Sequence, residues 1–417
     1  MASTDIKTTD ALVEETLHMA ESLERPLRYV QLNSFYNGST GAIMRGLHSQ
    51  LSSRGVDSYC FWGRRHESID DHMQCCASKP EVCLHGAMTR LHDRMGFYSK
   101  RDTAKLLKRL DEIDPDVIHL HNIHGYWVNI EMLFGWLATH RCQVRWTLHD
   151  CWAFTGHCAY FSYAKCTQWK TRCARSKSCP QLGTYPKTIS KASCARNFED
   201  KKRIFTSVPP ARMTLITPSQ WLSNLVEESF LKDYPVEVRH NTIDGAVFRP
   251  TPNDFRERYG IGDRFMILGV ASPWTERKGL GDFIQLADEL DSKKYAIVLV
   301  GLSEKQIKRL PNGIIGLTRT NSPQELAGIY STADVFFNPT VEDNFPTVNL
   351  EAEACGTPVV TYDTGGCKET LQLKKSLCCT DYNTSLISIM SLVRKSKDCV
   401  VNKRNACTIN TGEVDFR

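Results

Sequence analysis

The sequence predicts an α/β protein with two Rossmann-like domains, each built on a parallel sheet. Apolar runs alternate with helical patterns along the chain, which is typical of parallel βαβ units. The run AIVLV at 296–300 is apolar throughout, as expected for a parallel strand that is covered on both faces. A chain of 417 residues with 41% hydrophobic residues is long for one core and sufficient for two.

Five strands are predicted on each side of a junction near residues 240–262. The ligands of such sheets bind beyond the carboxyl ends of the strands, so candidate site residues are expected there. The predicted strands cover residues 27–32, 57–62, 117–121, 144–149 and 213–218 in the first half, and 265–271, 296–300, 314–317, 335–338 and 358–362 in the second.

The chain is divided on these grounds into two domains with flanking segments. Residues 1–26 lack the basic start and apolar core of a secretory signal and are expected to be an appended segment. Residues 27–243 form the predicted N-terminal domain, which includes a cysteine-rich insertion at 151–185. Residues 244–390 form the predicted C-terminal domain, and residues 391–417 are expected to be a tail.

Composition excludes several classes of protein. No run of about 18 uncharged apolar residues is present, so no membrane-spanning helix is expected. A formal net charge of +5 is small for this length and argues against nucleic acid as a partner. A Rossmann-type oxidoreductase is disfavoured because the G-x-G-x-x-G fingerprint with its later acidic residue is missing. These features favour a cytoplasmic protein.

Residues 338–366, NPTVEDNFPTVNLEAEACGTPVVTYDTGG, contain a strand, an acidic loop, a helix, a second strand and a Gly-Gly turn. Pro346 suits the first helical position, so the free amides that follow favour an anion such as a sugar diphosphate. Asp343 and Glu351 place a carboxylate at each end of this segment. Such a pair is also common on a solvated helix face, which is the alternative reading of the spacing.

This region resembles the donor-binding signature of the GT4 family of retaining glycosyltransferases. Further segments resemble the same family in its order, namely NSFYNGSTG at 33–41, NTID at 241–244 and GDRFMILGVASPWTERKGLGDFI at 262–284. Together they cover most of the chain. The resemblance implies the GT-B fold, with two Rossmann-like domains that face each other across a cleft, the acceptor on the N-terminal side and the donor on the C-terminal side.

The resemblance also implies roles for individual residues. Lys278 and Arg277 would contact the donor diphosphate, and Asp343 and Glu351 would contact sugar and ribose hydroxyls. His149 would act near the donor sugar. The implied catalytic residues are His149, Asp343 and Lys278, the implied donor-binding residues are Gly38, Ser39, Arg277, Lys278, Asp343, Asn344, Phe345, Thr347 and Glu351, and the acceptor-side candidate is His124.

Two positions depart from the family pattern. Asp343 stands where a Glu is usual, and Glu342 beside it is an alternative for the same role. Ser272 stands where an Arg is usual, and Arg277 is the replacement cation that the sequence offers. A non-catalytic relative that binds nucleotide sugar or glycan is therefore an alternative to an active enzyme.

The implied activity is transfer of a hexose-type sugar from a UDP- or GDP-sugar to a saccharide or lipid-linked acceptor, with retention of configuration. Retention in the family is explained by attack from the leaving-group face, so no protein nucleophile is needed. Since no Asp-x-Asp stands in a suitable position, no metal and no cofactor are predicted. The basic stretch 88–110 suits the anionic inner face of a membrane, and an ordinary pair of surface helices is its alternative.

Histidines and cysteines in the first half are also informative. His119 and His121 alternate along a strand and are expected to be hydrogen-bonded core residues. Asp150 could orient His149 or accept a proton, but neighbours on an extended chain point to opposite faces. The insertion has either a structural zinc or reduced thiols, because its cysteines are crowded but spaced more widely than in usual zinc hairpins. These cysteines are Cys158, Cys166, Cys173 and Cys179, with His157 adjacent.

Overall fold

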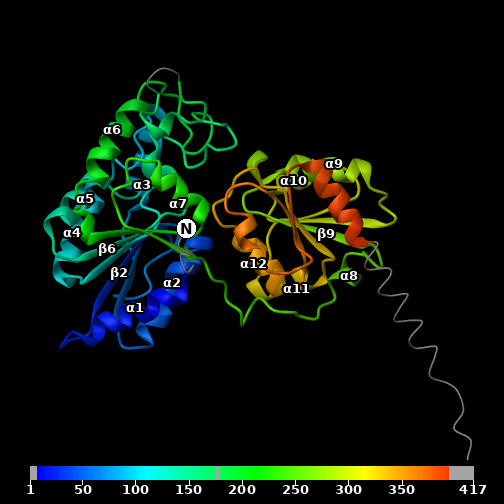
Figure 1. Ribbon diagram of the computed structural model, residues 1–417, viewed down its shortest axis with the longest axis horizontal. Helices are drawn as coiled ribbons and strands as arrows, with labels where there is room; N and C mark the ends of the chain where they lie inside the picture. Colours follow the sequence, from blue (N-terminus) through cyan, green and yellow to red (C-terminus); the bar gives the residue numbers. More distant parts are fainter. Residues whose placement is uncertain (1–6, 175–177, 394–417) are drawn as a thin grey trace, which may run out of the picture. The chain divides into compact units, whose positions relative to one another are not determined.

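The computed structural model describes residues 7–174 and 178–393 (Figure 1). The chain divides into two compact units between Thr242 and Ile243. Each unit has its own parallel sheet with helices against it, which confirms the predicted pair of Rossmann-like α/β domains. The predicted tail at 391–417 lies almost entirely outside the described residues.

The N-terminal domain is built on an eight-stranded parallel sheet in the order β1-β8-β7-β6-β5-β2-β3-β4. Its strands are β1 (Lys7–Thr8), β2 (Arg28–Phe35), β3 (Asp57–Arg64), β4 (Met73–Cys75), β5 (Val117–Leu120), β6 (Gln143–Thr147), β7 (Met213–Thr217) and β8 (Val236–His240). Its helices are α1 (Thr9–Glu21), α2 (Ser39–Ser52), α3 (Lys79–His92), α4 (Lys100–Ile113), α5 (Ile130–Thr139), α6 (Cys194–Phe205) and α7 (Gln220–Glu227), with short 3₁₀ turns η1 (Trp152–Phe154), η2 (Gln168–Lys170) and η3 (Pro210–Arg212).

The C-terminal domain is built on a six-stranded parallel sheet in the order β11-β10-β9-β12-β13-β14. Its strands are β9 (Phe265–Val270), β10 (Tyr295–Val300), β11 (Ile314–Leu317), β12 (Val335–Asn338), β13 (Val359–Tyr362) and β14 (Leu377–Cys379). Its helices include α8 (Phe255–Arg258), α9 (Leu280–Glu289), α10 (Glu304–Ile307), α11 (Pro323–Thr332) and α12 (Thr347–Ala354), with 3₁₀ turns η4 (Glu276–Lys278) and η5 (Lys368–Thr370).

All ten predicted strands are present, with ends within a few residues of those expected. Nine of the ten lie inside the sheets, where most side chains are buried, and several of them are apolar almost throughout. The tenth, β11, is a partly buried edge strand whose short apolar run IIGL was still recognisable. The strands that were not predicted, β1, β4, β8 and β14, are short or only partly buried.

The start of the chain is part of the N-terminal domain and differs from the appended segment that the sequence suggested. β1 pairs with β8, so that Lys7 lies opposite Arg239. α1 buries Leu12 and Val13 in a cluster that includes Tyr29. Residues 7–21 were misjudged because α1 has only a narrow apolar stripe, and β1 is too short to leave a pattern.

The basic stretch 88–110 comprises the end of α3, a connecting turn and most of α4. Its apolar residues Met95, Phe97, Leu106 and Leu110 are buried in the main core of the domain. Burial in the core therefore accounts for these four apolar residues, as the alternative of an ordinary pair of surface helices requires. Among the described residues, none of the helices combines the length and apolar character needed to cross a membrane.

The core of the C-terminal domain offers a direct test of the assigned packing. The Phe283 ring on α9 is fully buried, with centroids 5.5 Å from Trp274 and 5.2 Å from Phe337. Phe283→Ala is expected to lower the free energy of unfolding by about 3–5 kcal/mol, because the change leaves a cavity. The next residue, Ile284, is 36% exposed, so Ile284→Ala is a matched control with an expected loss of less than about 1 kcal/mol. Urea unfolding of both variants measures the difference, and equal losses would contradict the packing.

Candidate active site

Two neighbouring strands of the C-terminal sheet bring the proposed donor residues together. β9 pairs in parallel with β12, so the loops that follow them leave the same edge of the sheet. The loop after β9 carries Arg277 and Lys278, and the loop after β12 carries Asp343. Lys278 Nζ donates to Asp343 Oδ2 at 2.5 Å, and Arg277 Nη1 lies 3.8 Å from the same oxygen. The cations and the carboxylate predicted from distant motifs therefore form one group.

Two glycines allow these loops to approach closely. Gly279 has φ +74°, and a Cβ there would lie 2.3 Å from the carbonyl oxygen of Pro339. Gly365 has φ +59°, and a Cβ there would lie 1.8 Å from the carbonyl oxygen of Asp343. Only glycine fits both the left-handed backbone and the contact at each position. The Lys-Gly and Gly-Gly elements of the sequence thus have a steric role in closing the loops around Asp343.

Asp343 is a partly buried carboxylate held in its ionised form. Burial alone would raise its pKa, but the charges of Lys278 and Arg277 outweigh burial and leave the pKa below its ordinary value. The adjacent Glu342 is fully buried, and its carbonyl accepts a hydrogen bond from Arg277. Of the two acidic residues, the structure therefore places Asp343 with Lys278.

Helix α12 begins at Thr347, one residue later than the sequence suggested. Pro346 has ψ 106° and is the N-cap residue, so the expectation that it occupies the first helical position was wrong. A following helix still leaves its first amides without partners inside the helix. Asn344 and Phe345 are buried in the preceding loop, and Thr347 is half-buried. These residues place an anion-favouring helix start next to the Asp343 loop.

Glu351 lies on the second turn of α12 in an environment unlike that of Asp343. Tyr330 of α11 donates its hydroxyl to Glu351 Oε2 at 3.1 Å. Burial raises the pKa of Glu351 to about 7, and hydrogen bonds from Tyr330 and Thr347 only partly oppose this rise. Unlike Asp343, Glu351 therefore changes charge near neutral pH. The two carboxylates of the motif have different electrostatic roles.

In the N-terminal domain, Gly38 and Ser39 stand at the start of α2. Gly38 is the N-cap, with φ +85° and no side chain to cap the helix, and Ser39 is the first helical residue. The Asn33 side chain bonds the Phe35 carbonyl at 2.9 Å and shapes the loop before the helix. The glycine-rich segment thus ends β2 and presents uncapped helix amides, which is the arrangement expected for an anion.

Three histidines form a row at the carboxyl ends of β5 and β6. Ring centroids of His119 and His121 lie 4.2 Å apart, and those of His121 and His149 lie 5.4 Å apart. His121 Nδ1 lies 3.1 Å from His149 Nε2, and His119 is hydrogen-bonded to Tyr29 and Thr147. Burial lowers the pKa of His149 to about 4, and burial also lowers the pKa values of His119 and His121 well below their ordinary value. The prediction of hydrogen-bonded core histidines at 119 and 121 is confirmed.

A second polar group joins His124, Asp150 and Tyr185. His124 Nε2 lies 2.9 Å from Asp150 Oδ2, and its Nδ1 lies 3.0 Å from the Tyr185 hydroxyl. Asp150 therefore orients His124, and not His149 as one reading of the sequence allowed. Burial acts to raise the pKa of Asp150, but His124 and the Trp152 amide keep it below its ordinary value. No sequence pattern pointed to Tyr185, which lies 61 residues from His124 along the chain.

The two histidine groups share a small cavity. Its walls include His121, His124, His149 and Asp150, together with Trp152 of η1. The histidines that the sequence singled out therefore meet around one space at the carboxyl ends of adjacent strands.

Part of the chain matches the model of a known protein family. Residues 264–391 match the family model described as glycosyl transferases group 1, and this range includes Lys278, Asp343 and Glu351. Over this range the C-terminal domain is similar to glycosyl transferases group 1. This similarity supports a glycosyltransferase.

Curated relatives extend the similarity beyond this domain. A protein of Escherichia coli K12 named as a colanic acid biosynthesis glycosyl transferase, WcaC, is 24% identical over 79% of this chain and 80% of its own length. The GDP-mannose-dependent α-(1-6)-phosphatidylinositol monomannoside mannosyltransferase of Mycolicibacterium smegmatis is 32% identical over 31% of this chain and 38% of its own length.

Solved structures share the fold over both domains. Sucrose-phosphate synthase from Thermosynechococcus elongatus has a TM-score of 0.62 at 15% identity and covers 88% of this chain and 90% of its own. Anabaena HepE in complex with UDP-glucose has a TM-score of 0.57 at 15% identity and covers 89% and 91%. At such low identity the similarity shows the fold alone, and that fold is GT-B.

Proposed function

We propose that this glycosyltransferase moves a hexose-type sugar, with retention of configuration, from a nucleotide-sugar donor to a saccharide or lipid-linked acceptor. The broader activity that the similarities support is that of a glycosyltransferase in glycan or glycolipid biosynthesis. The group formed by Lys278, Arg277 and Asp343 beside the start of α12 is the observation that carries the finer proposal. The UDP-glucose in the HepE structure and the names of the curated relatives support a nucleotide-sugar donor.

The proposed chemistry follows from where charge develops. Breaking the anomeric C–O bond places negative charge on the departing diphosphate, so cations and helix amides near the phosphates stabilise the transition state. Lys278 and Arg277 supply the cations, and the free amides of α12 supply the dipole. Asp343 and Glu351 accept hydrogen bonds from sugar and ribose hydroxyls. This reaction needs neither a protein nucleophile nor a metal ion.

The N-terminal polar groups are proposed to serve the sugar and the acceptor. His149, with its low pKa, is neutral at physiological pH and can donate or accept one hydrogen bond without adding charge. His124 is fixed by Asp150 and Tyr185 and is the proposed acceptor contact. Exposed basic side chains on α4 are proposed to meet anionic lipid at the inner face of a membrane. They are Lys100, Arg101, Lys105 and Lys108.

A donor panel tests the proposal. The purified chain is incubated with UDP-, GDP-, ADP- and TDP-sugars, and nucleotide release and thermal shift are measured. One donor is expected to stabilise the protein and to release its nucleotide. Stabilisation without release, with every acceptor class supplied, would favour the alternative of a non-catalytic relative. Ser272, at a position where the family usually has Arg, is the observation that keeps this alternative open.

Asp150→Asn tests the acceptor-side assignment. The amide retains the shape of the side chain but removes the charge that orients the His124 ring. Transfer to the acceptor is expected to fall about 10²-fold, the lower end of the effect of a positioned acid–base group. Donor affinity is expected to stay within twofold, and nucleotide binding by calorimetry checks it. If donor affinity falls instead, the group belongs to donor binding and the assignment is wrong.

A further inference from the structure

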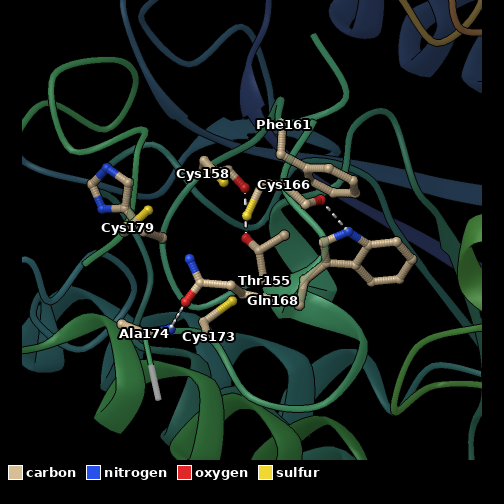
Figure 2. Close-up of a pocket in the computed structure, with 10 residues that line it drawn as sticks. Thr155, Cys158, Phe161, Cys166, Gln168, Cys173, Ala174 and Cys179 are labelled. Carbon is tan, nitrogen blue, oxygen red and sulfur yellow. Dashed lines mark hydrogen bonds between the residues drawn. The ribbon is translucent and has the colours of Figure 1, made fainter. Parts of the chain in front are cut away.

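Four thiols meet in the cysteine-rich insertion and at the start of α6. Hydrogen bonds join Cys158 to Cys179, Cys179 to Cys194, and Cys194 to Cys173. Cys166 lines the same pocket but takes no part in these bonds (Figure 2). The thiol cluster therefore consists of Cys158, Cys173, Cys179 and Cys194, a set that differs from the sequence prediction by one member.

Gly156 makes room for the thiol cluster. A Cβ at this position would lie 2.9 Å from Cys194 Sγ, 2.9 Å from Cys173 Cβ and 2.2 Å from the Cys194 carbonyl oxygen. The Gly156 amide donates to Cys173 Sγ at 3.2 Å. A backbone amide directed at sulfur stabilises the thiolate form, which is the form that binds metals. The absence of a side chain at Gly156 is thus what lets the two sulfurs approach the backbone.

A buried histidine beside the cluster has one ring nitrogen without a hydrogen bond. His157 Nδ1 lies 2.5 Å from Asp93 Oδ1, and both side chains are almost completely buried. In the described part of the chain, His157 Nε2 is buried without a hydrogen bond. The ring lines the pocket and interacts electrostatically with the Cys179 thiol. An unsatisfied buried nitrogen is costly, so a hydrogen-bond partner for Nε2 would stabilise this site.

A buried lysine also lies beside the cluster. Lys201 Nζ donates to the Trp152 carbonyl at 2.7 Å and to the Thr155 carbonyl at 3.0 Å. Its charge interacts with Cys158, Cys173 and Cys194. A tetrathiolate complex of a divalent ion carries a net charge of 2−, and an ammonium at Lys201 would partly offset it.

We propose that the thiol cluster binds one zinc ion. Zinc prefers four thiolate ligands in a tetrahedron, and such sites contribute directly to folding. Each thiol releases its proton to solvent as its sulfur binds the ion, so binding is favoured as pH rises. Among residues 7–174 and 178–393, no three His, Cys, Asp or Glu side chains already surround one point as metal ligands. The thiols must therefore exchange their mutual hydrogen bonds for bonds to the ion.

The proposed ion would stabilise the part of the insertion that reaches the second polar group. The insertion begins directly after Asp150 and contains Tyr185, which contacts His124. Among its described residues, 151–174 and 178–185, the regular structure consists of two short 3₁₀ turns. A bound metal ion adds more to the folding stability of a segment with so little secondary structure than to that of a helix or strand.

Metal content of the purified chain tests the proposal. Wild type is expected to contain one zinc ion per chain, whereas Cys179→Ser and Cys194→Ser lose it. Cys166→Ser is the matched control and is expected to retain the ion, because Cys166 is a cysteine of the same pocket outside the cluster. Replacement by cobalt is expected to give the thiolate charge-transfer absorption of a tetrahedral site. Loss of zinc in Cys166→Ser with retention in Cys194→Ser would overturn the assigned ligands.

A second experiment on wild type does not depend on whether the variants fold. Iodoacetamide labelling with and without a zinc chelator, followed by mass spectrometry, reports the accessibility of each thiol. Cluster cysteines are expected to react only after chelation, whereas the exposed Cys83 reacts in both conditions. Equal labelling of the cluster in chain loaded with zinc and in chain treated with chelator, or cluster cysteines joined as disulfides, would overturn the proposal.

Discussion

Lys278→Ala is expected to reduce the turnover number by about 10²–10³-fold, the effect of removing one preorganised group that stabilises developing charge. Lys278 contacts Asp343, and the proposed diphosphate would draw its ammonium away from this carboxylate. The substitution removes the nearer of two cations, since Arg277 is 3.8 Å from Asp343 Oδ2. Steady-state kinetics with the donor identified by the panel measures the loss.

Two controls separate catalysis from stability. Lys293→Ala removes an exposed lysine of the same domain and is expected to leave turnover unchanged. Lys278→Arg keeps the charge but not the compact ammonium, so partial activity is expected. Urea unfolding of Lys278→Ala is expected to show a loss of about 1–3 kcal/mol, because Asp343 loses its closest partner. Full turnover in Lys278→Ala would remove Lys278 from the proposed mechanism.

Glu351→Gln is expected to weaken donor binding by about 10–100-fold at pH 8, as a hydrogen bond to a charged group contributes about 1.5–3 kcal/mol. The pKa of Glu351 near 7 makes this effect depend on pH. Below pH 7 the wild-type carboxyl is protonated, and donor affinity falls about tenfold for each further pH unit. The affinity of Glu351→Gln is expected to lack this step. Calorimetric titration between pH 5.5 and 8.5 measures both profiles.

Stability gives an independent check on the same group. Because the pKa of Glu351 is higher in the folded state than its ordinary value of 4.5, the folded protein binds the extra proton between these pH values. Wild type therefore loses stability as pH rises from about 4.5 to about 7. The difference in unfolding free energy between Glu351→Gln and wild type should grow over this range. A constant difference would mean that the carboxyl titrates at its ordinary value.

The sequence predicted most of the fold because the inner strands have their own local pattern. β10 and β12 are buried on both faces, so their apolar runs are visible without any knowledge of neighbours. The sequence also placed Lys278 and Asp343 at the carboxyl ends of strands, the edge where parallel sheets bind ligands. That β9 and β12 are neighbours, so that these two residues meet, is known only from the fold.

Other features depend on contacts that leave no local pattern. Cys194 opens a helix outside the cysteine-rich segment, and only the packing of α6 against the insertion brings it to Cys179. Tyr185 reaches His124 in the same way. The partner of Asp150 was undecided because two histidines lay near it in the sequence, and backbone placement alone decides between them. Tertiary packing, rather than propensity, fixes these contacts.

The pairing of β1 with β8 has a consequence for how the protein is made. β1 is the first element of the chain and β8 is the last strand of the N-terminal domain, so their register joins Lys7 to Arg239. On the ribosome, the first strand must remain unpaired until more than two hundred further residues have been synthesised. Until then β1 is an open edge that a chaperone or another chain can occupy.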